Sequence, residues 1–130
     1  MICLDSDFII DLLKQKPDAV LKLKSLRGET LVSTEVNYFE ILYGIFKKHI
    51  FSQKELDLIQ EFFDALRTIT FDHISAYNAA KISSDLEKED MIIGFNDSLI
   101  AGICVSNNCS ILTKNVKHFL RIKELKVETY

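Results

Sequence analysis

The sequence contains few of the residues that interrupt regular structure, with one proline and four glycines among its 130 residues. Long flexible linkers are therefore not expected. A chain of this length fits one domain, and its 48% apolar residues are enough for one hydrophobic core. We expect a single domain over residues 1–130.

Cysteine is also scarce and lacks a recognisable pattern. The sequence has three cysteines, Cys3, Cys104 and Cys109, and this odd number argues against a disulfide framework. They show no Cys-x-x-Cys or Cys/His spacing, which argues against a structural zinc site. Each lies among apolar neighbours, so we predict buried, reduced thiols rather than catalytic ones. Reduced thiols are typical of a reducing compartment.

Long apolar runs are missing as well. A membrane span needs about 20 apolar residues, and Asn96 and Asp97 interrupt the longest apolar stretch. The first residues lack the basic region of a secretory signal peptide. We therefore expect a cytoplasmic protein with no membrane partner.

The formal net charge is −3, whereas a surface that binds nucleic acid nonspecifically is usually basic. A metal-dependent nuclease remains compatible with this charge, because bound cations supply positive charge locally.

The hydrophobic pattern alternates between short apolar runs and longer helical periods. Strands are predicted at 1–4, 30–33, 69–71, 110–113 and 126–129, and helices at 34–48, 53–67, 73–89 and 96–107. Ser52 and Glu55 form a capping box for the second of these helices. Short apolar strands between helices favour a parallel sheet covered on both faces, with ligands at the carboxyl ends of the strands.

Most of the 19 acidic residues have a Lys or Arg within four positions, as exposed helix faces usually do. Seven do not: Asp5, Asp7, Glu35, Glu40, Glu61, Asp72 and Asp97. Glu35 and Asp72 fall at helix starts, where the helix dipole favours a carboxylate, and Glu61 faces away from the apolar stripe of its helix. Asp7 is interpreted as a cap rather than a ligand.

The remaining three carboxylates are harder to explain by local structure. Glu40 lies in a segment that is apolar on nearly all sides, where an unpaired charge is costly. The options are an ion pair with a distant cation, protonation or a metal ion. Asp97 could complement a helix dipole with Asn96 as the cap, and Asp5 could cap a helix that begins near Ser6.

Together, the three favour a metal site. If Asp5, Glu40 and Asp97 converge, they repel one another unless a divalent cation joins them. Hard oxygen ligands favour Mg²⁺ or Mn²⁺ over zinc. Such a site can activate water and stabilise a pentavalent phosphorus centre in phosphodiester hydrolysis.

At this point the sequence resembles the PIN-domain nucleases, in particular the VapC-type toxins of toxin–antitoxin pairs. The resemblance covers nearly the whole chain and depends on the order and spacing of several motifs. These are Ile2-Cys3-Leu4-Asp5-Ser6-Asp7, Ser33 through Glu40 to Tyr43-Gly44, Ile93-Gly94-Phe95-Asn96-Asp97-Ser98-Leu99-Ile100-Ala101, and Leu112-Thr113-Lys114-Asn115 with Phe119 and Leu125-Lys126-Val127-Glu128.

The resemblance implies a three-layer α/β/α sandwich with a central, mostly parallel sheet. It implies cleavage of RNA by an Mg²⁺- or Mn²⁺-dependent endoribonuclease, an antitoxin partner that blocks the site, and a homodimer. The metal-binding acids carry over to Asp5, Glu40 and Asp97, while Ser6 and Thr113 correspond to positions that support the site through hydrogen bonds.

Two positions depart from the family pattern. A fourth acid of many relatives corresponds to Asn115, which can hold a metal or a water but adds no charge, and a nearby acid corresponds to His118. Three charges favour one tightly held metal ion over a permanent pair. Lys114 and Lys117 flank Asn115, so with His118 they are candidates for RNA contacts; the alternative is a solvated basic face.

Two other functions remain open. A haloacid-dehalogenase-like phosphohydrolase would use Asp5 as nucleophile and Asp7 as acid, with Lys114 as the required lysine, but it leaves Glu40 without a role. A non-catalytic module that binds protein or RNA is compatible with the amide at Asn115, but has no reason to keep three repelling carboxylates.

Overall fold

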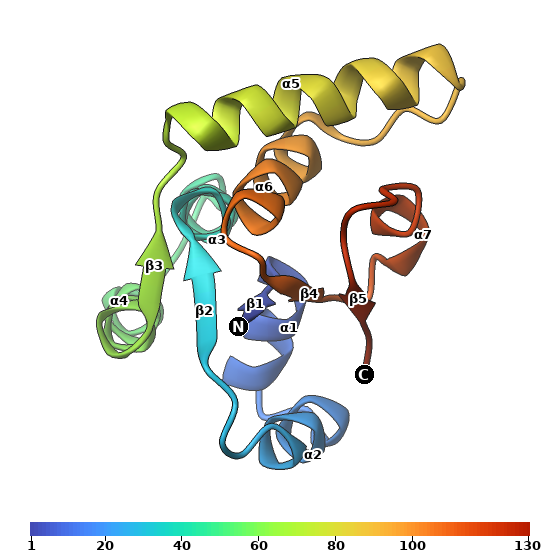
Figure 1. Ribbon diagram of the computed structural model, residues 1–130. Coiled ribbons are helices and arrows are strands. Elements are labelled where there is room, and N and C mark those ends of the chain that lie inside the picture. The colour runs from blue at the N-terminus through green and yellow to red at the C-terminus, as the bar shows by residue number, and fades with distance from the viewer.

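The computed structural model describes residues 1–130 and contains one five-stranded sheet (Figure 1). All neighbouring strands are parallel, in the order β3-β2-β1-β4-β5. The strands are β1 (Ile2–Leu4), β2 (Leu31–Thr34), β3 (Arg67–Ile69), β4 (Ser110–Leu112) and β5 (Val127–Glu128).

Helices cover both faces of this sheet and complete the predicted three-layer sandwich (Figure 1). The helices that pack mainly on one face are α1 (Ser6–Leu13), α2 (Pro17–Ser25), α3 (Glu35–Phe46) and α4 (Gln53–Ala65). Those on the other are α5 (His73–Lys88), α6 (Phe95–Ser106) and α7 (Val116–Phe119). None of the seven helices has the length and apolarity needed to cross a membrane.

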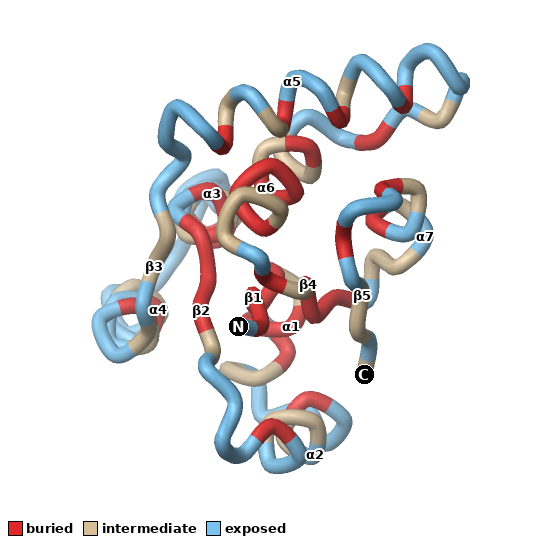
Figure 2. Tube along the Cα trace, viewed as in Figure 1, coloured by how far each residue is buried: buried red, intermediate tan, exposed pale blue.

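Two hydrophobic cores lie on opposite sides of the sheet, because successive side chains of a strand point to opposite faces. Cys3 and Ile111 belong to the core under α5 to α7, whereas Leu4 and Leu112 belong to the core under α1 to α4. Figure 2 shows the buried strands β1, β2 and β4 between helices whose outer sides are exposed. Full burial of a large apolar side chain contributes about 1.5–3 kcal/mol.

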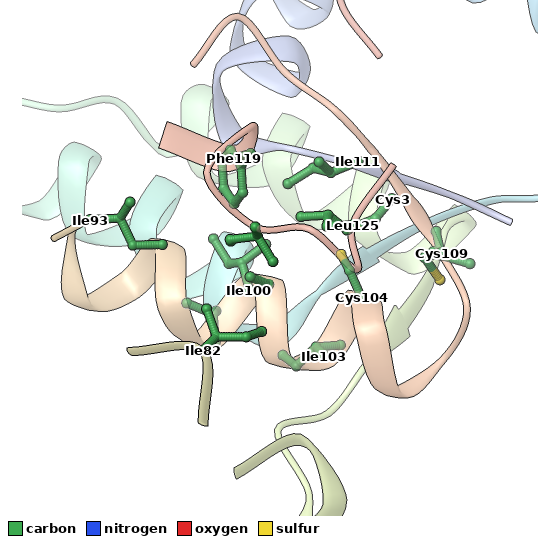
Figure 3. Packing of buried hydrophobic residues seen from close by; sticks show 14 of the residues in the cluster. Cys3, Ile82, Ile93, Ile100, Ile103, Cys104, Cys109, Ile111, Phe119 and Leu125 are labelled. Atoms are coloured by element: carbon green, nitrogen blue, oxygen red, sulfur yellow. The ribbon is translucent and has the colours of Figure 1, made fainter. Parts of the chain in front are cut away.

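The three cysteines lie in the first of these cores, as predicted. Cys3, Cys104 and Cys109 are free and buried. Figure 3 shows them beside Ile111 and Leu125. Their environment is that of apolar packing residues.

Helices α5 and α6 approach each other closely at Gly102. A Cβ added there would lie 2.6 Å from the carbonyl oxygen of Ser75 and 2.7 Å from Cβ of Ala79. The glycine therefore fixes how closely α6, which carries Asp97, can pack under α5.

Several predicted boundaries differ from the structure. Strand β3 begins two residues before the predicted 69–71, because the exposed Arg67 occupies an edge strand where a charged side chain is tolerated. Helix α2 was not predicted, since only Ala19 of its residues is fully buried and its apolar stripe is weak. The capping box of Ser52 and Glu55 is confirmed at the start of α4.

The strand order places a topological switch point next to β1. The chain continues from β1 to β2 on one side and reaches β4 on the other, so the carboxyl ends of β1 and β4 lie side by side. Leu4 pairs with Leu112, and the amide of Asp5 donates to the carbonyl of Leu112 at 3.0 Å. Asp5 and Thr113 therefore meet at the sheet edge where parallel α/β proteins bind ligands.

Candidate active site

Asp5 lies at the centre of a polar network and is only 6% exposed. It is the N-cap of α1: Oδ1 accepts hydrogen bonds from the Ser6 amide and Asn37 Nδ2, both at 2.9 Å. Oδ2 accepts from the Thr113 hydroxyl at 2.7 Å. Burial raises the pKa of Asp5 to about 7, and the charges of Asp7 and Glu40 add to the rise although the bonds from Thr113 and Ser6 lower it.

Glu40 points from α3 toward the same network. The hydroxyl of Ser6 donates to Oε1 at 2.8 Å, and Nδ2 of Asn96 lies 3.4 Å from Oε2. Partial burial raises the pKa of Glu40, and nearby Asp97 and Asp7 raise it further. Glu40 forms no ion pair. The alternative explanation of Glu40 as the partner of a distant cation is therefore wrong.

Asp97 lies in the first turn of α6, with its side chain 18% exposed. Its Oδ2 is 3.1 Å from Asn115 Nδ2 and 3.0 Å from His118 Nδ1. The local explanation of Asp97 required Asn96 to cap α6, but the N-cap of α6 is Gly94. The side-chain amide of Asn96 donates to Glu40 instead.

Asn37 joins the carboxylates and was missed in the sequence. Its buried Nδ2 reaches both Asp5 Oδ1 and Ser6 Oγ at 2.9 Å, while its Oδ1 accepts from the Thr34 hydroxyl at 2.6 Å. Thr34 is also the N-cap of α3, and its hydroxyl oxygen accepts from the backbone amide of Asn37. The backbone and the side chain of Asn37 are therefore both bound to Thr34 at the start of α3. The only signal was a polar residue three positions before Glu40 on an apolar helix.

Asp7 belongs to the network as well, although its predicted role was a helix cap. Asp5 is the cap, and Asp7 lies in the first turn. Its Oδ2 accepts from the Lys114 amide at 2.8 Å and from the Thr113 hydroxyl at 3.2 Å. Thr113 donates to Asp5 and Ser6 to Glu40, and that these bonds support a metal site stays a prediction.

The basic residues near the site differ in where their side chains lie. The ammonium of Lys114 is bound to Asp11 Oδ2 at 2.8 Å, so it is already engaged rather than free for RNA. Lys117 is exposed and has no ionic partner. His118 contacts Asp97 and lies 3.0 Å from Asn115 Nδ2.

The donor set suits a hard divalent cation. Asp5 caps α1, Glu40 lies on α3 and Asp97 on α6, and none of the three pairs with Lys or Arg. As folded, no group of three His, Cys, Asp or Glu side chains is arranged to hold a metal ion. The hydroxyl of Ser6 and the amide of Asn37 bind carboxylate oxygens of Glu40 and Asp5. The carboxyl groups of Asp5 and Glu40 have raised pKa values. A divalent cation bound to their oxygens would neutralise the negative charge that these groups carry when ionised.

A doubly covered parallel sheet with acids at its carboxyl edge defines the class: an α/β protein with an acidic, hydrolase-type site. The PIN domain model matches residues 2–125. The chain is 30% identical over 127 residues to Ribonuclease VapC1 of Haemophilus influenzae strain R2866, covering 95% of this chain and 92% of the relative. It is 24% identical over 127 residues to the tRNA(fMet)-specific endonuclease VapC of Salmonella typhimurium, covering 98% and 96%.

A solved structure gives the same assignment. The crystal structure of VapBC2 from Rickettsia felis, bound to a DNA fragment from its promoter, superposes with a TM-score of 0.90 at 26% identity. The match covers 100% of this chain and 99% of the other. The chain belongs to the PIN-domain family and is related to the VapC ribonucleases. Nucleases of this family generally depend on divalent metal ions.

Proposed function

We propose that the protein is an Mg²⁺- or Mn²⁺-dependent endoribonuclease and the toxin of a VapBC-type toxin–antitoxin pair. The single observation that carries the proposal is the polar network at the carboxyl edge of the sheet. It brings together three acids, Asp5 at the start of α1, Glu40 on α3 and Asp97 on α6, and none of them pairs with a lysine or an arginine. Relatives named as ribonucleases and endonucleases over nearly the whole chain support the reaction class.

In this proposal Asp5, Glu40 and Asp97 hold the metal, and Asn115 completes the catalytic set. A bound Mg²⁺ or Mn²⁺ supplies Lewis-acid stabilisation of the phosphate and lowers the pKa of a water molecule. Hydrolysis then adds a water oxygen to phosphorus and releases one ribose oxygen. Three formal charges favour one tightly held ion.

The surrounding polar side chains orient the acids. Asn37 and Thr113 fix the two oxygens of Asp5, and Ser6 and Asn96 fix those of Glu40. All are neutral donors, so they hold the carboxylates without cancelling the charge that attracts the metal. Asn115 Nδ2 and His118 Nδ1 lie 3.1 Å and 3.0 Å from Oδ2 of Asp97 and position this carboxylate.

The surface beside Glu40 supports a protein partner. An apolar groove between α1, α3 and α4 begins at Glu40 and is lined by side chains including Ile10, Ile41, Ile45 and Leu58. We propose that an antitoxin segment occupies this groove, because a segment bound there can reach the acids and block them. The neighbouring Rickettsia felis structure is a VapBC complex.

Other features complete the proposal. One domain comprises residues 1–130, and exposed aromatic side chains on α3 and after it offer a homodimer contact: Phe39, Tyr43, Phe46 and Phe51. Lys117 is the better placed of the predicted lysines for an RNA phosphate. Buried free thiols agree with the cytoplasm as its compartment.

The test is cleavage of RNA by the purified protein with Mn²⁺, followed by sequencing of the cut ends. We expect cleavage that requires the metal and is abolished in Glu40→Gln, while Glu35→Gln, an exposed glutamate on the same helix, retains it. A folded wild-type protein that binds RNA but neither cuts it nor binds Mn²⁺ would instead be a non-catalytic binding module. The phosphohydrolase is disfavoured because Lys114 is paired with Asp11.

A further inference from the structure

Asp11 is a buried carboxylate outside the proposed catalytic set. It lies on α1, is 7% exposed, and has partners on both oxygens. Oδ1 pairs with Lys16 at 3.0 Å, while Oδ2 accepts from Lys114 Nζ at 2.8 Å and from the Tyr130 hydroxyl at 2.9 Å. We call Asp11, Lys16, Lys114 and Tyr130 the Asp11 cluster. Hydrogen bonds from Lys114, Lys16 and Tyr130 hold the pKa of Asp11 well below its usual range.

The cluster is connected to the site through the loop that follows β4. Lys114 stands between Thr113, which donates to Asp5, and Asn115, whose amide group meets Asp97. The backbone amide of Lys114 is bound by Asp7 and its ammonium by Asp11. Both ends of this one residue are therefore attached to α1, the helix that Asp5 caps.

Aromatic packing holds the same residue from a third side. The ammonium of Lys114 lies 4.7 Å from the centroid of the Tyr130 ring. That ring packs edge-to-face on the fully buried Phe8 at 4.8 Å. Cation–π and edge-to-face contacts of this kind restrict the side chain of Lys114 to one direction.

We propose that Asp11 is a positioning residue for the nuclease site, acting through Lys114 to hold the Thr113–Asn115 loop against Asp5 and Asp97. This inference rests on the proposed function for its catalytic consequence, but its structural part is independent of it. It assigns Lys114 to positioning instead of RNA binding. Without the ion pair, the loop keeps its backbone bond to Asp7 but loses the attachment that fixes its direction.

The test compares Asp11→Asn with Lys114→Met in RNA cleavage and in hydrogen exchange. A displacement of catalytic groups by about 1 Å can reduce rate a hundredfold, so we expect each variant to lower kcat by about ten- to a hundredfold while KM changes less than threefold. The double variant should lose no more than either single one, because all three remove the same interaction. Lys16→Met is the matched control: it removes a partner of the same carboxylate that does not touch the loop, and kcat should stay unchanged.

Hydrogen exchange separates this inference from the proposed function. The Asn115 amide donates to Thr113 Oγ1 at 2.9 Å, so its exchange reports loop order even in a protein that cuts no RNA. We expect the Asn115 amide to exchange at least tenfold faster in Asp11→Asn and Lys114→Met. In Lys16→Met its exchange rate should equal that of wild type. Unchanged exchange in both loop variants overturns the inference. A raised KM in Lys114→Met, together with a wild-type kcat and KM in Asp11→Asn, also overturns the inference. That result would assign Lys114 to RNA binding.

If Asp11→Asn does not fold, Tyr130→Phe provides the same comparison. It keeps the ring against Phe8 and removes only the hydroxyl bonded to Asp11. We expect a smaller change in the same direction in both kcat and Asn115 exchange. A normal kcat and normal exchange in Tyr130→Phe, together with normal values in Lys114→Met, contradict the inference.

Discussion

Replacing Asp5 by asparagine is expected to stabilise the metal-free protein at pH 8 while abolishing RNA cleavage. The carboxylate is almost fully buried among neutral donors, with Asp7 and Glu40 adding repulsion. Asparagine has the same shape and keeps an oxygen for Ser6 and Asn37. Its new NH₂ group faces Thr113, whose hydroxyl can accept it and turn its proton to Asp7 Oδ2, 3.2 Å away.

The sign and size of the effect follow from the pKa of Asp5. This pKa is about 7 in the folded protein and 3.8 in the unfolded chain. Well below pH 3.8 both states are protonated and the group costs nothing. As pH rises from 4 to 7 the unfolded chain releases its proton first, so stability falls, and above pH 7 the loss is complete at roughly 4 kcal/mol. Allowing for the reorientation of Thr113, Asp5→Asn should gain roughly 2–4 kcal/mol at pH 8 and almost nothing at pH 4.

The assay is thermal unfolding in EDTA at pH 4 and pH 8. A gain of this size corresponds to a rise in Tm of roughly 8–15 °C at pH 8. The control is Asp64→Asn, an exposed carboxylate on α4, which should shift Tm little at either pH. Mn²⁺ should then raise the Tm of wild type but not of Asp5→Asn, because only the folded wild-type site binds it. An equal or lower Tm for Asp5→Asn at pH 8 would refute the reasoning.

Four further outcomes can be checked separately. Asp97→Asn should abolish cleavage with an unchanged circular dichroism spectrum, and residual cleavage above a tenth of wild type would remove Asp97 from the site. His118→Asp should tighten Mn²⁺ binding several-fold in calorimetry, because it adds a carboxylate beside Asp97; equal affinities would place His118 outside the metal's reach. Gly102→Ala should lower stability in urea by roughly 2–3 kcal/mol through overpacking on Ser75. Gly44→Ala, where a Cβ meets no atom within 4 Å, should raise it by roughly 0.5–1 kcal/mol.

The fold could be predicted where the local pattern and the tertiary environment agree. Strand β1 is fully buried and continuously apolar, and the buried residues of β4, Ile111 and Leu112, are apolar as well. β3 is at the sheet edge, where Arg67 can face solvent, and its register therefore depends on pairing with β2 instead of on its own pattern. α2 has few buried residues, so its periodicity carried little signal.

The acids of the site could be found because each lacks a nearby cation. The same criterion missed Asp11, which has Lys14 three positions away. Lys14 is not among its partners, and two of them, Lys114 and Tyr130, are more than 100 residues distant. Asn37 was missed because an amide has no charge to be left unpaired. The roles of Asp5, Glu40 and Asp97 as metal ligands stay predictions until a metal is measured at the site.

The central position of β1 has a consequence for how the protein is made. Residues 2–4 pair with residues 31–32 on one side and with 110–112 on the other. During translation the first pairing can form early, but Asp5 meets Thr113, and Asp97 meets Asn115, only after residues 113 and 115 have been synthesised. Contacts between such distant residues also form late in folding, since a long loop must first close. A nascent chain that ends before Asn115 thus lacks the hydrogen bonds around Asp5 and Asp97, and the proposed catalytic centre is not yet assembled on the ribosome.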